Sequence, residues 1–359
     1  MDMMIRFPNL GVELGYVGRS VRIFGFEITF GGMLLALGML AGLAFIVLEA
    51  KRRNENQDAY VGMMITAVIF GLIGARLFYV GFSWDLYKDN ILEIFNIRNG
   101  GTAFYGGLLG GMLGAAIYCG IRRLSFMKMA DTACMGLVVA QIIGRWGDFF
   151  NRESFGEYTN SVLAMQLPLS SVRSSQVSAA MRENLVTVNG VSFVQVHPAF
   201  FYESAWCLVL FLLLLVWKRR KSFQGEIFLR YLTGYGLGRF LLEWIRTDKL
   251  VIPGTGISVS MVISVILFVL CGIMGMVRRT MAKKRAKVKK RRREEDYEAE
   301  EKAAREAEGH DSLEADDLLS ETHTKENPEN PDAEAAKEAG QTDPVPSGSA
   351  EESGNEPEA

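Results

Sequence analysis

Arginine and carboxylate residues occur within long apolar stretches of this sequence, where ionised side chains are costly. Arg145 and Asp148 lie in one stretch, and Arg239, Glu243 and Arg246 lie in another. A charge at the centre of a membrane span costs at least ~2.5 kcal/mol on insertion scales, so such residues normally face a protein interior or a watery cavity. A guanidinium forms two parallel charge-assisted hydrogen bonds with a phosphate. Arg145 and Arg239 therefore predict a site for an anionic lipid head group.

Two structural explanations compete with this prediction. Arg239 and Glu243 have the i, i+4 spacing of an ion pair within a helix, which neutralises both charges. Arg145 lies near the end of its apolar stretch, where an ordinary snorkelling side chain also reaches the interface. Arg246 continues the face of Arg239 and Glu243, and a surplus of guanidinium would need an anion. The sequence leaves the balance of charge open.

Further polar residues lie in or beside the apolar stretches. Arg76 lies inside one of them, Asn151 and Glu153 follow Arg145, and His197 precedes Glu203 by six positions. A single histidine at the end of a span is more often a hydrogen-bonded structural residue than a base. One histidine without clustered carboxylates does not provide the ligands of a zinc or magnesium site. We expect no metal and no cofactor.

The apolar stretches predict the fold class. Each is close to the ~20 residues that a helix needs to cross ~30 Å of hydrocarbon. The first has no small-residue cleavage site, so we interpret it as an anchor. The sequence predicts an all-α polytopic membrane protein whose domain, residues 1–277, has about seven spans. The apolar stretches are residues 29–49, 60–82, 102–121, 129–150, 199–217, 226–246 and 256–277.

The distribution of charge predicts the orientation. Basic residues at 51–53, 122–128, 218–221 and from 278 onward fall on one side of the predicted spans, so we expect that side to be cytoplasmic and the amino terminus to be outside. Residues 278–293 contain eleven Lys or Arg, and we expect them to bind anionic membrane lipids rather than nucleic acid. Residues 294–359 contain 23 Asp or Glu against four Lys or Arg, which predicts a disordered cytoplasmic tail.

Two loops on the opposite side have their own patterns. Residues 151–196 are expected to form a small external cap, with a hairpin turn at Asn189-Gly190. Residues 83–98 predict a brief amphipathic helix at the interface. The glycines between residues 100 and 114 recur at roughly helical spacing, which favours close helix packing around Tyr105.

These motifs, in this order, resemble the phosphatidylglycerol:prolipoprotein diacylglyceryl transferase family of bacterial inner membranes over roughly residues 20–277. The most specific element is G-R-x-G-x-F-x-N-x-E-x-x-G from Gly144 to Gly156. It departs from the family only at Asp148, where members usually have Asn. Supporting motifs are Gly74-Ala-Arg76, Gly100-Gly-x-x-x-Tyr105-Gly-Gly, His197-Pro-x-x-x-Tyr202-Glu203 and Arg239-x-x-x-Glu243-x-x-Arg246.

The resemblance implies a lipid-transfer reaction. In the family, the sn-1,2-diacylglyceryl group of phosphatidylglycerol passes to the lipobox cysteine of a preprolipoprotein, and glycerol 1-phosphate leaves. It implies that Arg145 binds the phosphate, that Arg239 stabilises the leaving group and that Glu243 orients Arg239. The expected lipid-binding residues are Arg145, Asp148, Asn151, Glu153, Gly156, Arg246, Arg76 and His197, and the expected catalytic residues are Arg239, Tyr105, Glu243 and Glu203.

The sequence does not identify the base that accepts the thiol proton. Many members of the family have His where Tyr105 stands, and Tyr where Phe30 stands. Tyrosine is a weaker base than histidine near neutral pH. The candidates are Tyr105, Glu203 and Glu243, or deprotonation by the arginine field alone. A transporter or a lipid-binding scaffold is the alternative function, although residues 20–150 and 150–277 show no evident inverted repeat.

Overall fold

The computed structural model describes residues 4–323, apart from residues 25, 89, 97–99, 248, 250, 252 and 253. The chain divides into two compact units, Met1–Lys289 and Lys290–Ala359. Residues 324–359 of the predicted tail lie outside the described residues.

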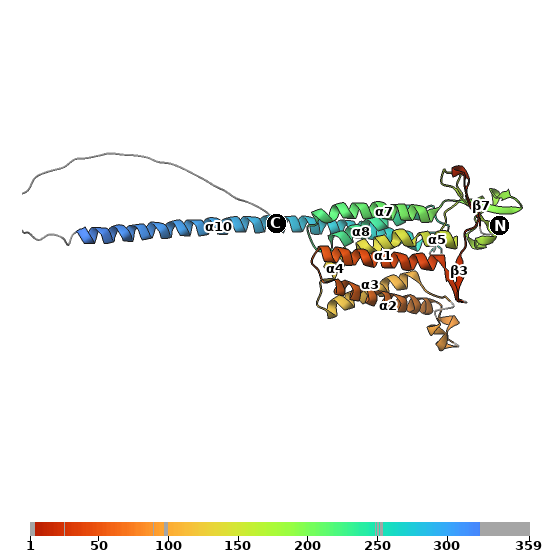
Figure 1. Ribbon diagram of the computed structural model, residues 1–359, viewed down its shortest axis with the longest axis horizontal. Helices are drawn as coiled ribbons and strands as arrows, with labels where there is room; N and C mark the ends of the chain where they lie inside the picture. Colours follow the sequence, from red (N-terminus) through yellow and green to blue (C-terminus); the bar gives the residue numbers. More distant parts are fainter. Residues whose placement is uncertain are drawn as a thin grey trace, which may run out of the picture. The chain divides into compact units, whose positions relative to one another are not determined.

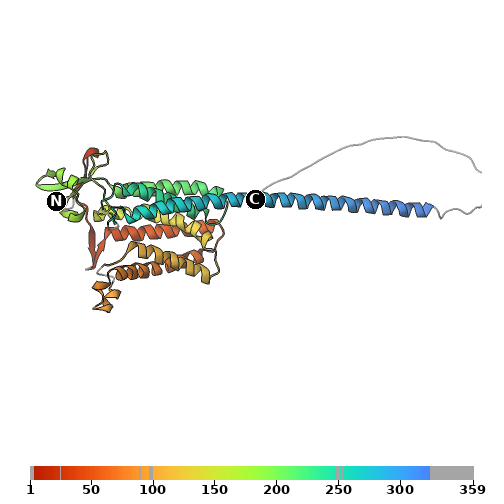
Figure 2. The same cartoon turned by 180° about the vertical axis from the view of Figure 1, so that it is seen from behind.

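A bundle of helices forms the body of the first unit (Figures 1 and 2). Helix α1 packs against α4, α2 against α3, and α8 against α4, α7 and α9. A π-helical turn, Leu267–Cys271, connects α9 to α10. The helices are α1 (Phe30–Arg52), α2 (Gln57–Phe82), α3 (Phe104–Ile121), α4 (Phe126–Gly144), α5 (Trp146–Asn151), α6 (Ala179–Glu183), α7 (Ala199–Trp217), α8 (Glu226–Glu243), α9 (Val259–Ile266) and α10 (Gly272–His323).

Within the described residues, six helices are long and apolar enough to cross a membrane. The prediction of a helical polytopic membrane protein is confirmed, but the number seven is not. The stretch predicted at 226–246 forms α8, which has four charged residues among its 18 residues. Helix α8 lies against α4, α7 and α9, so neighbouring helices cover much of it.

Glycines set the spacing between the helices. A Cβ atom added to Gly74 of α2 would lie 2.5 Å from the carbonyl oxygen of Gly106 in α3. A Cβ atom on Gly42 of α1 would lie 2.5 Å from the carbonyl oxygen of Gly136 in α4. Because no side chain fits in either place, the glycines allow direct backbone contact between helices. This finding supports the packing role that their spacing predicts.

Two small β-sheets accompany the helices of this mostly helical fold. The larger sheet has the strand order β2-β1-β5-β7-β6, and β3 and β4 form a separate hairpin. Figure 1 shows β7 and β3 at the end of the bundle where α1 and α7 begin. The strands are β1 (Ile5–Phe7), β2 (Val12–Leu14), β3 (Ser20–Ile23), β4 (Phe26–Thr29), β5 (Met165–Pro168), β6 (Val186–Val188) and β7 (Val191–Val196).

The predicted hairpin turn is confirmed within the larger sheet. Asn189 has φ 51° and Gly190 has φ 77°, and both values lie in the left-handed region that a two-residue hairpin turn requires. The sheet covers its own apolar core, which includes Ile5, Phe155 and Val194. Strand β7 leads through His197 and Pro198 directly into α7, so the sheet is connected to the start of that helix.

The helical tail differs from the prediction. Helix α10 continues to His323, whereas residues 294–323 were expected to be disordered. Acidic residues follow the basic segment at helical spacing: Lys290 lies 3.4 Å from Glu294, and Arg291 lies 2.8 Å from Glu295. Such i, i+4 pairs and the many Ala, Glu, Lys and Arg residues favour a helix that composition alone does not reveal.

Candidate active site

The carboxylate of Glu203 is the centre of an ion-pair cluster. Its Oε2 lies 2.6 Å from Nε of Arg145. Its Oε1 lies 2.7 Å from Nη1 of Arg239 and 2.8 Å from Nη1 of Arg246. Glu203 is 5% exposed, so these contacts replace water around a buried charge. One glutamate of α7 therefore binds three arginines from three other parts of the chain.

Two further carboxylates complete the cluster. Oδ2 of Asp148 lies 3.3 Å from Nη1 of Arg145, and Oε2 of Glu243 lies 3.3 Å from Nη2 of Arg239. The predicted i, i+4 pair of Arg239 and Glu243 is thus present, as part of a larger network. Among the described residues, these ion pairs join three guanidinium groups to three carboxylates.

Close packing between α5 and α1 positions Arg145. Arg145 lies at the junction between α4 and α5. A Cβ atom on Gly147 would lie 3.1 Å from the Cα atom of Gly31 at the start of α1. A Cβ atom on Gly31 would in turn lie 2.7 Å from the side-chain nitrogen of Asn151. Asn151 therefore packs against α1 and holds the short helix that follows Arg145.

Another close approach positions Arg239. The Trp206 indole of α7 occupies the space that a side chain at Gly238 would need. Its Nε1 donates a hydrogen bond of 3.0 Å to the carbonyl oxygen of Gly234 in α8. The ring thus fixes α8 against α7, so that Arg239 meets Glu203.

Gly156 connects the sheet to the segment that carries Arg246. Its N–H donates to the carbonyl oxygen of His197 at 2.9 Å, and it forms an antiparallel bridge with Arg246. A Cβ atom on Gly156 would lie 2.5 Å from Cγ2 of Ile245 and 2.8 Å from Cβ of His197. The structure therefore places Gly156 where three backbone segments converge.

His197 and Glu153 contact residues other than the arginines of the cluster. Nδ1 of His197 lies 3.2 Å from the Tyr202 hydroxyl. Burial lowers the pKa of the His197 imidazole below its ordinary value of 6.5, because it disfavours the charged ring. Glu153 forms an exposed ion pair of 2.8 Å with Arg173. These contacts favour the structural interpretation of His197 and place Glu153 at the surface.

Arg76 has a different set of partners from the other arginines. Its five N–H groups all point to backbone carbonyl oxygens at 2.7–3.0 Å. The side chain is 6% exposed and also lies over the Tyr87 ring, 5.1 Å from its centroid. Arg76 therefore holds the segment between α2 and α3, where residues 84–86 and 91–95 form 3₁₀ turns in place of the predicted amphipathic helix. The carbonyl oxygens belong to Glu93, Ile94, Asn96, Gly100 and Gly101.

Tyr105 contacts a residue that the sequence did not single out. Its hydroxyl lies 2.9 Å from Oγ of Ser260 in α9. The hydroxyl of Ser258, two residues earlier, donates a hydrogen bond to Oε1 of Glu243. Serine at the start of a helix usually signals an N-cap, so its type and position gave no reason to assign it to a site.

A small cavity of about 10 Å³, room for one water molecule, lies among the cluster residues. Within the described residues, Arg145 uses Nε and Nη1 for its ion pairs, while its Nη2 forms none. A phosphate could therefore bind Arg145 only if the surrounding side chains move apart. The cavity is lined by Arg145, Glu203, Trp206, Cys207, Tyr235, Gly238, Arg239 and Leu242.

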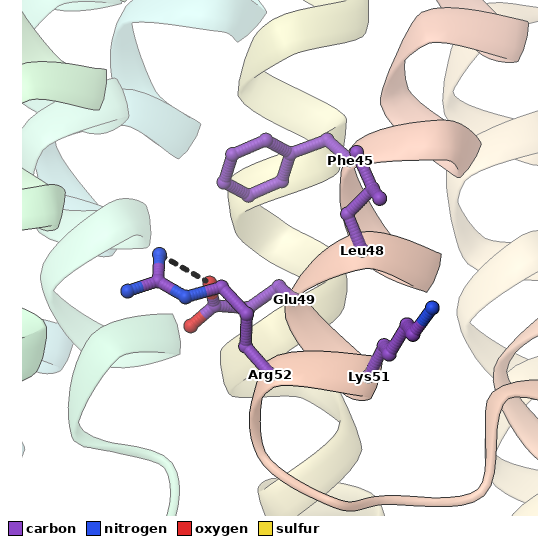
Figure 3. A pocket seen from close by; sticks show the side chains of 5 residues that line it. All are labelled: Phe45, Leu48, Glu49, Lys51 and Arg52. Atoms are coloured by element: carbon purple, nitrogen blue, oxygen red, sulfur yellow. Dashed lines mark ion pairs between the residues drawn. The ribbon is translucent and has the colours of Figure 1, made fainter. Parts of the chain in front are cut away.

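A larger hollow, of about 470 Å³, lies at the other end of α1 (Figure 3). Glu49 is its acidic residue and pairs with Arg52 at 3.8 Å and with Lys218 at 2.9 Å. This single carboxylate is already neutralised, and none of the residues of the arginine cluster lines the hollow. We therefore assign the candidate chemistry to the cluster around Glu203. The hollow is lined by Phe45, Leu48, Glu49, Lys51 and Arg52.

Comparison with known proteins assigns the chain to a family. The family model described as prolipoprotein diacylglyceryl transferase matches residues 19–278. A phosphatidylglycerol–prolipoprotein diacylglyceryl transferase of Clostridioides difficile (strain 630) is 40% identical over 230 residues, which are 64% of this chain and 83% of that protein. The proteins of the same name from Listeria innocua and Bacillus cytotoxicus are 36% and 35% identical, over 70% and 72% of this chain and 86% and 91% of theirs. The chain therefore belongs to the prolipoprotein diacylglyceryl transferase family.

Proposed function

We propose that this chain transfers the sn-1,2-diacylglyceryl group of phosphatidylglycerol to the lipobox cysteine of a preprolipoprotein. The cysteine sulfur forms a thioether bond with the carbon of the diacylated glycerol that carries the phosphate. The bond from that carbon to the phosphate oxygen breaks, and glycerol 1-phosphate leaves. The names of the relatives supply the substrates. The convergence of Arg145, Arg239 and Arg246 on Glu203 is the observation that carries the site.

Arg145 is the arginine that binds the phosphate of the lipid. Its side chain is 24% exposed, against 8% for Arg246, so it is the more accessible of the two. Its Nη2 forms no ion pair or hydrogen bond with the described residues. A planar guanidinium binds phosphate through two parallel hydrogen bonds. The phosphate competes with Glu203 and Asp148 for this guanidinium.

Arg239 stabilises the leaving group. Negative charge grows on the phosphate oxygen as its bond to carbon breaks, and a fixed cation in a poorly solvated site lowers the energy of that charge. Arg239 is 18% exposed and is held from two sides by Glu203 and Glu243. Arg246 keeps Glu203 in place while the lipid phosphate occupies Arg145.

Glu243 is the acceptor of the thiol proton. Thiolate is the attacking species, so the proton must leave the cysteine. Glu203 uses both oxygens for three arginines, and the Tyr105 hydroxyl is already within hydrogen-bond distance of Ser260. Oε2 of Glu243 is buried and has no hydrogen-bond partner among the described residues. It lies 3.3 Å from Arg239, which is within ion-pair distance, and it keeps a lone pair for a proton.

The charge pattern supports an orientation in the bacterial cytoplasmic membrane. Basic residues at the ends of α1 and α7 pair with acids at one end of the bundle, as Lys218 does with Glu49 at 2.9 Å. Lys221 likewise pairs with Asp131 at 2.7 Å. That end is cytoplasmic, because positive charge is retained there. The site, at the end with the sheet, faces outside, where preprolipoproteins emerge.

The basic segment at residues 278–293 adds an interaction with the membrane. Its side chains are mostly exposed along α10. Each Lys or Arg near an anionic membrane surface contributes about 1 kcal/mol of attraction. This segment therefore binds the head groups of anionic lipids in the cytoplasmic leaflet.

Release of glycerol 1-phosphate tests the proposed function. The purified full-length protein is mixed with phosphatidylglycerol vesicles and a lipobox peptide, and both products are measured by mass spectrometry. The proposal predicts equal amounts of diacylglyceryl peptide and glycerol 1-phosphate. A lipid-binding scaffold or a transporter would bind phosphatidylglycerol and release neither product.

A further inference from the structure

Ser258 occupies the N-cap position of α9 without capping the helix with its side chain. Its carbonyl oxygen accepts the N–H groups of Met261 and Val262 at 3.1 and 3.2 Å, and its backbone is extended, with φ −72° and ψ 134°. An N-cap serine usually accepts a hydrogen bond from an N–H of its own first turn, and that bond stabilises the helix. The Ser258 side chain forms no such bond.

The hydroxyl is directed instead at a carboxylate of the site. It donates to Oε1 of Glu243, and both side chains are buried, at 3% and 1% exposure. This contact joins two helices, because Glu243 is the last residue of α8 and Ser258 is the residue before α9. The Ser258 hydroxyl therefore contacts Glu243 and does not stabilise α9 by capping it.

The hydrogen bond from Ser258 gives the two oxygens of Glu243 different partners. Oε1 accepts from Ser258, while Oε2 lies 3.3 Å from Nη2 of Arg239 and accepts no hydrogen bond from the described residues. A carboxylate without the first bond could rotate and use both oxygens for the guanidinium. The start of α9 also contacts the other hydroxyl at the site, since Ser260 lies 2.9 Å from Tyr105.

We propose that Ser258 is a positioning residue for the transfer reaction, which holds Glu243 with Oε2 beside Arg239 and open to the thiol proton. This inference rests on the proposed function, because it assigns Ser258 a task only through Glu243. Ser258 acts on the chemical step and does not touch the phosphate.

The test compares four variants of the full-length protein: Ser258→Ala, Ser258→Thr, Ser258→Cys and Ser264→Ala. Ser264 is the matched control, because it is a buried serine of α9 whose hydroxyl, among the described residues, donates only to the backbone carbonyl oxygen of Ser260. Thr keeps the hydroxyl donor, and Cys keeps the volume with a weak donor. The measurements are kcat, the KM for phosphatidylglycerol and the melting temperature in detergent.

Loss of one hydrogen bond to a charged group predicts a kcat about 10- to 100-fold lower for Ser258→Ala and Ser258→Cys, with KM changed by less than about 2-fold. Ser258→Thr is expected to recover kcat to within about 3-fold, and Ser264→Ala to match the wild type. If Ser258→Ala does not fold, the Cys and Thr variants make the same comparison. A kcat for Ser258→Cys equal to that of the wild type, or an equal loss in Ser258→Thr, overturns the proposal.

A second comparison separates this inference from the proposed function. The Ser258→Ala change is also made in a Glu243→Asp background. If Ser258 acts through Glu243, the two losses in kcat combine to less than their product. Losses that multiply fully overturn the positioning role. A wild-type protein that releases no glycerol 1-phosphate would instead contradict the proposed function itself.

Discussion

Nε of Arg145 lies 2.6 Å from Oε2 of Glu203, and this pair joins the end of α4 to the first turns of α7. Both residues belong to separate motifs in the sequence. The pair is part of a cluster in which Arg145, Arg239 and Arg246 each already have a carboxylate partner. The proposed function therefore requires an anionic lipid to bind by exchange with these carboxylates.

Replacing Glu203 with Gln is expected to destabilise the protein and to make its stability depend on anionic lipid. Three arginines lose their shared carboxylate, and breaking a buried ion pair costs about 3 kcal/mol or more. The melting temperature is measured in micelles with phosphatidylglycerol or with phosphatidylcholine. Phosphatidylglycerol should restore more stability to Glu203→Gln than phosphatidylcholine does. Glu153→Gln is the control, because its pair with Arg173 is exposed and contributes less than about 1 kcal/mol. Equal effects of the two lipids would show that the arginines do not take up an anionic head group.

Gly156→Ala is expected to weaken the connection between the sheet and Arg246. The new methyl group would lie 2.5 Å from Cγ2 of Ile245 and 3.0 Å from its carbonyl oxygen, so the segment must shift. Overpacking of this kind costs about 1–3 kcal/mol. We expect a lower melting temperature and at least about a 10-fold loss of activity, because Arg246 moves with Ile245. Gly120→Ala serves as the control, since nothing lies within 4 Å of its added Cβ. A Gly156→Ala protein as stable and active as the control would contradict this role.

His197 predicts a pH dependence of stability. Burial lowers the pKa of its imidazole in the folded state, while the unfolded chain keeps the ordinary value of 6.5. Between these two values the unfolded state binds more protons, so the free energy of unfolding falls as pH falls through this window. Below the folded-state pKa the loss is complete and this contribution stays constant. The melting temperatures of the wild type and His197→Asn are compared from pH 8 to about pH 5. The difference between them should shrink as pH falls; parallel curves would mean that His197 does not contribute.

Tyr105 is not expected to be the base. If Glu243 accepts the thiol proton, Tyr105→Phe loses only the hydrogen bond to Ser260 and keeps activity within about 10-fold of the wild type. Tyr105→His restores a polar group and should be at least as active. The diacylglyceryl-transfer rate is measured for both variants. A loss of activity of more than about 100-fold in Tyr105→Phe, with activity retained in Tyr105→His, would show that the side chain at position 105 accepts the thiol proton.

The sequence predicted those features that depend on neighbours along the chain. The turn at Asn189-Gly190 follows from two residue types that tolerate positive φ, and the pair of Arg239 and Glu243 follows from helical spacing. The apolar stretches predicted six of the helices in nearly the observed places. In each case the local sequence pattern was sufficient to predict the structure.

Features that depend on distant segments could not be predicted in the same way. Strand β1 pairs with β5, which lies about 160 residues later in the sequence. These strands have three and four residues, which is too short for an alternating pattern that would predict them. The sequence gives no reason to pair Glu203 with Arg145, because their contact depends on the packing of α7 against α4. The contact between Ser258 and Glu243 depends on how α8 and α9 lie against each other. The sequence predicts that Arg76 binds lipid, whereas in the structure its N–H groups donate to backbone carbonyl oxygens.

The two arginines at the proposed phosphate provide the most direct test of the account. Arg145→Ala, Arg239→Ala and Arg182→Ala, a variant of an exposed arginine in α6, are purified. The kcat and KM are measured for transfer from phosphatidylglycerol vesicles to a lipobox peptide. Loss of a charged contact to the phosphate predicts a rate at least about 100-fold lower for Arg145→Ala and Arg239→Ala, mainly in KM for the first and in kcat for the second. Arg182→Ala should match the wild type. Near-normal transfer by either Arg145→Ala or Arg239→Ala would contradict the assignment of the phosphate site.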